Sequence, residues 1–71
     1  MLDRVLLWNF GRIEVFDEQD HLLSSQKDSL EHRKDIVKDT TDKTQFIFAE
    51  LDETTGKQRR RLISQTVFLH W

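Results

Sequence analysis

The most concentrated positive charge in the sequence lies between Lys57 and Arg61, where Lys-Gln-Arg-Arg-Arg places four cationic side chains within five residues. Such a cluster, with an aromatic ring such as Trp8 to stack on a base, is typical of nucleic-acid contact. In a strand, however, Arg59 and Arg61 share one face and Arg60 takes the other. The net charge of −2 also argues against a protein built to neutralise phosphates. Nucleic-acid binding through Lys57, Arg59, Arg60 and Arg61 is therefore the alternative prediction.

The remaining polar residues form no catalytic or metal-binding pattern that we recognise. His21, His32 and His70 lack the i, i+4 spacing of a zinc-protease helix, and the chain has no cysteine to assist them. Its two glycines cannot build a phosphate-binding loop, and the acidic groups lack the spacing of a calcium loop. A chain of 71 residues leaves little volume for a substrate cleft. We therefore predict that the protein is not an enzyme, binds no metal or cofactor, and has no small-molecule substrate.

Composition indicates a small domain with a lean core under a charged surface. Hydrophobic residues make up 37% of the chain and charged residues 34%, where soluble domains average about 25% charged. A chain this short buries only about 60% of its unfolded surface, and without cysteine no disulfide can stabilise it. No apolar run approaches the ~18 residues that span a bilayer. We predict a single domain over residues 1–71, cytoplasmic, with no membrane partner and with a tendency to bind itself or another protein.

The first half of the chain contains two clear strand patterns and one ambiguous segment. Residues 2–8 are mostly apolar and residues 12–16 alternate, so we expect two strands joined by a turn at 9–11. Beyond them, apolar residues recur at a spacing of seven, which keeps side chains on one helix face. This spacing predicts a helix over about 26–38, with Ser25 near its start. A rival interpretation keeps residues 21–24 as a third strand.

The last third of the chain predicts a hairpin. Residues 45–51 and 58–70 are rich in strand-forming residues, and Gly56 suits a turn that needs a positive φ. Counting outward from that turn places Glu50 opposite Arg60, Phe48 opposite Leu62, and Ile47 opposite Ile63. Opposite charges and apolar pairs then meet across the ladder, which favours this register.

The end of the chain carries large apolar groups on both faces of the predicted final strand, residues 62–71. A strand that is apolar on both sides is either central in a sheet or covered by another chain. Aromatic residues contribute most to interface energies, so we predict that Trp8, Phe68 and Trp71 anchor a partner.

Together these patterns predict an α+β fold, with an antiparallel sheet of about four strands and one short helix in the order ββαββ. The alternative fold is an all-β meander or partial barrel. The predicted function is that of a protein-interaction module: a small regulator, an inhibitor or an assembly subunit of an oligomer. It would act by docking an apolar sheet face or by adding an edge strand to another sheet.

Overall fold

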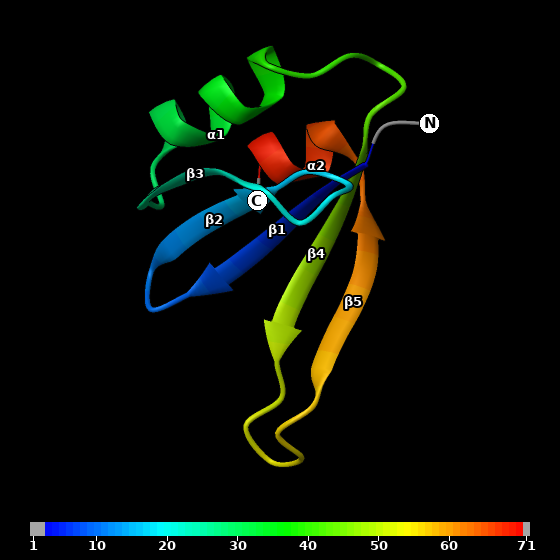
Figure 1. The fold of residues 1–71 in the computed structure, drawn as a ribbon. Coiled ribbons are helices and arrows are strands. Elements are labelled where there is room, and N and C mark those ends of the chain that lie inside the picture. The colour runs from blue at the N-terminus through cyan, green and yellow to red at the C-terminus, as the bar shows by residue number, and fades with distance from the viewer. Residues whose placement is uncertain (1–2, 71) are drawn as a thin grey trace.

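The computed structural model describes residues 3–70 as a five-stranded sheet covered by two helices (Figure 1). The elements in chain order are β1 (Asp3–Asn9), β2 (Arg12–Phe16), β3 (Leu22–Lys27), α1 (Leu30–Lys38), β4 (Gln45–Leu51), β5 (Gln58–Ile63) and α2 (Gln65–Leu69). The order across the sheet is β3-β2-β1-β4-β5. β1 pairs with β4 in parallel, and the other neighbouring strands are antiparallel. Both helices lie on the same face of this sheet (Figure 1).

The fold class is α+β, as predicted, but the element order differs from the prediction. The sequence indicated ββαββ with about four strands, whereas the order is βββαββα with five. The two helices also exclude the alternative all-β arrangement. The sheet is mixed because α1 carries the chain from edge strand β3 across to β4 beside β1, and such a crossover lets two strands pair in parallel.

The hairpin of β1 and β2 confirms the predicted turn. Asn9 pairs with Arg12, and the two residues between them, Phe10 and Gly11, have φ of 52° and 72°. Two positive φ values in a two-residue loop are the pattern of a type I′ turn, whose twist matches that of the strands. The alternation in β2 then buries Ile13 and Val15 against the helices, at 1% and 4% exposure.

The predicted start of the first helix, near residue 26, is wrong. Residues 22–27 form β3, which overlaps the third strand that the rival interpretation placed at 21–24, and α1 begins only at Leu30. The cap is Ser29, whose Oγ accepts a hydrogen bond of 3.1 Å from the His32 backbone N–H. Ser25 instead pairs with Glu14 across the sheet. The predicted end of the helix, at residue 38, is confirmed.

The prediction that the final strand continues through residues 62–71 is confirmed only for 62 and 63 and is wrong for 64–70. β5 ends at Ile63, and Ser64 caps α2 by accepting a hydrogen bond of 3.0 Å from the Val67 N–H. Helical turns place Phe68 in the core, where it is 1% exposed and lies edge-on to Phe46 at 5.4 Å between ring centroids. The apolar alternation at the end of the chain therefore belongs partly to a strand and partly to a helix.

The register of the second hairpin differs by one residue from the prediction. Glu50 faces Arg59 and not Arg60, Phe48 faces Arg61 and not Leu62, and Ile47 faces Leu62 and not Ile63; Phe46 takes Ile63 as its partner. The reason lies in Asp52, whose carboxylate accepts hydrogen bonds from the N–H groups of Thr54 and Thr55. The Asp52 N–H in turn donates to the Lys57 carbonyl at 2.9 Å, which closes a four-residue loop. Four residues thus separate Asp52 from Lys57, whereas the predicted register, with Glu50 opposite Arg60, leaves a loop of three.

The core lies between the helices and one face of the sheet. Its buried apolar members come from strands and helices alike: Leu6, Ile13, Val15, Ile36, Phe46 and Phe68. Within residues 3–70, no helix is long and apolar enough to cross a membrane.

Candidate functional site

The face of the sheet turned away from the helices carries an apolar row that crosses every strand. Strand alternation points Leu6, Ile13, Val15 and Phe46 into the core, so their neighbours along each strand point to the opposite face. Register partners on that face are Leu22 with Phe16, Phe16 with Val5, Val5 with Ile47, and Ile47 with Leu62. We call these five residues, Leu22, Phe16, Val5, Ile47 and Leu62, the apolar band.

The apolar band is open at its two ends and partly shielded in its middle. Leu22 in edge strand β3 is 54% exposed, and Leu62 in edge strand β5 is 66% exposed. Phe16, Val5 and Ile47 are half-buried by their lateral neighbours. The next row adds Leu7 and the fully buried Ala49, and Leu51, 61% exposed, extends the surface further along β4. Neither of the two described helices covers this face (Figure 1).

Charges of both signs flank the apolar band on the same face. The adjacent row runs Ser25, Glu14, Leu7, Ala49, Arg60 from β3 to β5. Within residues 3–70 no ion pair involves Glu14. Among the described residues, the Arg60 side chain makes one hydrogen bond, of 3.3 Å, to the Gln58 side chain. The row therefore has one carboxylate on one side of β1 and one guanidinium on the other, and neither forms an ion pair with a described residue.

Arg33 is a buried cation that joins the helices to the sheet. It is 7% exposed, and two of its nitrogens donate 2.7 Å hydrogen bonds to the two carboxylate oxygens of Asp28. A third nitrogen donates to the Phe68 carbonyl at 2.9 Å, and the guanidinium lies 4.8 Å from the centroid of the Trp8 ring. These hydrogen bonds hold the pKa of Asp28 below its ordinary value. The group links α1, α2 and β1 and is structural.

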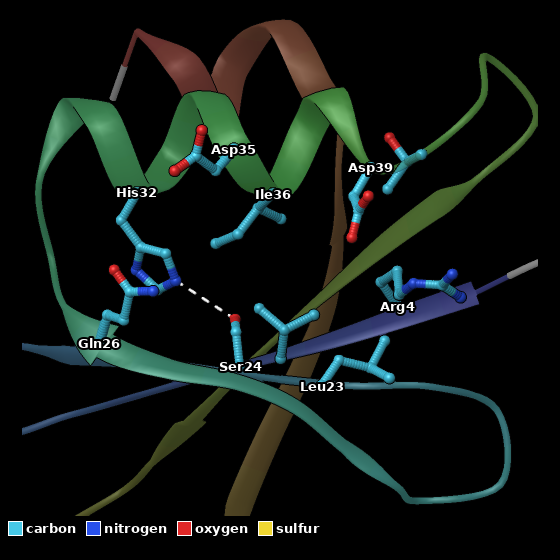
Figure 2. A pocket seen from close by; sticks show the side chains of 10 residues that line it. Arg4, Leu23, Ser24, Gln26, His32, Asp35, Ile36 and Asp39 are labelled. Atoms are coloured by element: carbon cyan, nitrogen blue, oxygen red, sulfur yellow. Dashed lines mark hydrogen bonds between the residues drawn. The ribbon is translucent and has the colours of Figure 1, made fainter.

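A cavity of about 100 Å³ lies between β3 and α1 (Figure 2). His32, 2% exposed, points its Nε2 at the Ser24 Oγ, 3.2 Å away. A serine nucleophile requires a base that a third group orients through the other ring nitrogen. His32 Nδ1 is buried and bonds to none of the described residues, so this pair lacks the orienting group. Burial lowers the pKa of His32, which keeps the imidazole neutral near pH 7.

Two of the predicted aromatic anchors, Trp8 and Phe68, lie on the helix side of the sheet, where Arg33 contacts both rings. Trp8 is half-buried on the helix side of the sheet, edge-on to Phe48 with 5.9 Å between ring centroids. Phe68 is a buried core residue. Trp71 lies outside the described residues. The involvement of all three in partner binding stays a prediction.

The basic cluster is split between the two faces, as strand geometry predicted. Arg59 and Arg61 lie on the helix side of β5, opposite Glu50 and Phe48, and Arg61 stacks over the Phe48 ring at 5.4 Å. Arg60 points to the apolar-band side, and the exposed Lys57 closes the hairpin loop opposite Asp52. Glu50 therefore offsets part of the positive charge next to the two arginines that share a face.

Phe10 forms a second apolar feature at the tip of the first hairpin. Its side chain is 95% exposed, and its φ of 52° is uncommon for a bulky residue. It borders an open groove of about 470 Å³ whose other apolar walls are Trp8, Phe48 and Leu51. Glu50 and Glu53 also line this groove, so it is apolar with an acidic rim.

Sequence reasoning missed the apolar band because its members come from five separate strands. Alternation within β1 and β4 signals that Val5 and Ile47 face away from the core, but only the topology places them side by side. Leu62 joins the band because of the one-residue register difference set by Asp52.

No family model, curated protein or solved structure matches this chain. Among residues 3–70 there is no group of three or more histidine and acidic side chains placed to hold a metal ion. The function of this protein is therefore inferred from the geometry of the chain itself.

Proposed function

We propose that this protein is an interaction module that docks through its apolar band onto another protein surface. The observation that carries the proposal is the unbroken apolar row on the uncovered face, from Leu22 in β3 to Leu62 in β5. Monomeric proteins rarely leave a large contiguous apolar patch in water, and such patches mark binding sites. A cysteine-free chain suits the cytoplasm, and we place this activity there.

The size of the face fits a protein partner. Five strands at ~4.8 Å spacing make a sheet about 24 Å wide, and six residues along a strand give about 20 Å. The projected area is then roughly 500 Å², and the accessible surface of a corrugated face exceeds its projection. A standard interface takes about 800 Å² from each partner, which is comparable.

Docking of the face is better supported than pairing at a sheet edge. Edge strand β5 carries Arg59, Arg60 and Arg61 in succession, and charged side chains on an edge oppose the addition of another strand. Edge strand β3 pairs with β2 through a register irregularity at Val15 and Phe16, which bends the neighbouring ladder.

The test compares two double variants with matched exposure. Leu22→Lys with Leu62→Lys places charges at both ends of the apolar band, at sites 54% and 66% exposed. Leu30→Lys with Val67→Lys does the same on α1 and α2, at sites 56% and 54% exposed. Association is measured by light scattering of the purified chain at ~100 μM and by quantifying the proteins that copurify with the chain from its native source.

We expect the band variant to lose self-association or its copurifying protein by at least 10-fold, and the helix variant to keep it. Equal behaviour of the two variants would overturn the proposal, as would a wild-type chain that associates with nothing. Circular dichroism melting shows that each variant still folds, which the exposure of all four sites favours.

Nucleic-acid binding at the Lys57–Arg61 hairpin remains the second candidate, supported by Arg59 and Arg61 sharing a face beside Phe48. It predicts binding that weakens steeply with salt. Arg59→Glu with Arg61→Glu would remove such binding and leave the protein association above unchanged.

A further inference from the structure

We propose that the surface which covers the apolar band is the same face of a second copy of this chain, related by a two-fold axis that runs along β1. The inference rests on the proposed function and specifies its partner. It follows from two properties of the face: the band superposes on itself under this rotation, and the flanking charges become complementary.

The first property is the symmetry of the apolar band about its middle strand. β1 is the third of five strands, so rotation about an axis along it places β3 over β5 and β2 over β4. Leu22 then faces Leu62 of the second copy, and Phe16 faces its Ile47, each contact occurring twice. Val5 meets its own counterpart on the axis. Every apolar group of the row meets another apolar group, as in aligned packing of two sheets.

The second property concerns Glu14 and Arg60, which lie in one row on opposite sides of β1. After the rotation, Glu14 in β2 lies over β4 of the second copy, one strand away from Arg60 in β5. One strand spacing is about 4.8 Å, a lateral offset that the long arginine side chain can bridge. The symmetry makes two such ion pairs, from groups that have no charged partner in the described chain.

Other two-fold arrangements do not bring these charges together. A two-fold axis that runs across the strands, along the apolar band, would also stack the band on its counterpart. It would, however, place the rows that contain Glu14 and Arg60 on opposite sides of the band in the two copies, where they do not meet. The pairing of Glu14 with Arg60 therefore distinguishes the axis along β1. The same axis brings the two Asp3 carboxylates toward each other at the rim, one row beyond the band, and this repulsion limits the affinity.

The experiment uses charge reversal in the full chain. Glu14→Arg alone puts two arginine pairs in the interface, and Arg60→Glu alone puts two glutamate pairs there. We expect each single variant to raise the dimer dissociation constant at least 10-fold in sedimentation equilibrium at low salt. An equimolar mixture of the two variants forms a heterodimer in which both pairs are again opposite in sign, so it should dimerise as tightly as wild type. The chain carrying both reversals should do the same.

Arg59→Glu is the matched control, because Arg59 neighbours Arg60 in β5 but lies on the helix side. It should leave the dissociation constant within about 2-fold. If a reversed variant fails to fold by circular dichroism, Glu14→Gln and Arg60→Gln replace it, each with an expected rise of several-fold.

The outcomes separate this inference from the proposed function. A chain that stays monomeric at ~100 μM, or a mixture of Glu14→Arg and Arg60→Glu that stays monomeric, overturns the two-fold dimer. If the lysine variants of the band still abolish capture of a different protein in that case, the proposed function stands. If the dimer forms but is insensitive to lysines in the band, both proposals are wrong.

Discussion

Phe10 keeps a large apolar ring in water on a backbone conformation that is unfavourable for it. A positive φ brings the Cβ of an ordinary residue close to its following carbonyl, at a cost of about 1 kcal/mol or more. Asn and Gly tolerate it, and Asn-Gly is the preferred pair for a type I′ turn. With Gly11 already at the second turn position, Phe10 is the residue that departs from the preferred pair.

We predict that Phe10→Asn raises the free energy of unfolding by about 1 kcal/mol, because it relieves this conformation. Chemical denaturation at fixed protein concentration measures the change. Phe10→Ala is the control, since alanine removes the ring and keeps the unfavourable φ. An equal gain in both variants would show that the exposed ring, and not the backbone, is responsible.

At the scale of elements, short-range chemistry decided where the helices start and how the second hairpin closes. Ser25 and Ser29 are the same residue type four positions apart, and only Ser29 caps α1 because Ser25 is engaged in β3. Ser64 likewise caps α2, so that the helix begins within a segment whose apolar residues alternate as in a strand. The type of β1, β2 and β4 could be predicted, because each has a strong strand pattern. The cap choices could not, since several polar residues compete locally for each role.

The junction of α1 with α2 depends on the ion pair of Asp28 and Arg33. We predict that Asp28→Ala lowers the free energy of unfolding by about 3 kcal/mol, because it leaves the buried Arg33 guanidinium without its carboxylate. Urea denaturation followed by circular dichroism measures the loss. Lys34→Ala, an exposed neighbour of Arg33 on α1, should change stability by less than about 0.5 kcal/mol. A loss below 1 kcal/mol in Asp28→Ala would show that the pair contributes little.

At the scale of the whole molecule, the candidate site is a product of topology. The anchors that the sequence suggested, Trp8 and Phe68, lie on the helix side of the sheet, whereas the apolar band lies on the other side. The parallel pairing of β1 with β4 places Val5 beside Ile47. The residue pattern of neither strand indicates which other strand it pairs with. The expectation of an apolar sheet face that docks to a partner came from the lean core, the absence of cysteine and the apolar residues near the chain end. It named Trp8, Phe68 and Trp71 and none of the residues of the apolar band.

The stability of the whole fold should depend on pH through His32. Burial lowers its pKa below the ordinary 6.5, and the carboxylates of Asp35 and Asp28 oppose this only in part. In the unfolded chain, His32 therefore becomes protonated near pH 6.5. In the folded chain it becomes protonated only at a lower pH. The free energy of unfolding is therefore highest above pH 6.5. It declines as the pH falls from 6.5 to the pKa of His32 in the folded chain, by at most about 1.4 kcal/mol per pH unit.

We predict that urea unfolding at one protein concentration gives a lower free energy at pH 5 than at pH 7.5. His32→Gln should flatten this slope, whatever its effect on stability at pH 7.5, because the group that takes up the proton is gone. His70→Gln, which alters an exposed histidine at the end of α2, should keep the slope of the wild type. A wild-type free energy that is constant over this interval, or a slope that survives in His32→Gln, would mean that the buried imidazole does not govern the acid sensitivity of the fold.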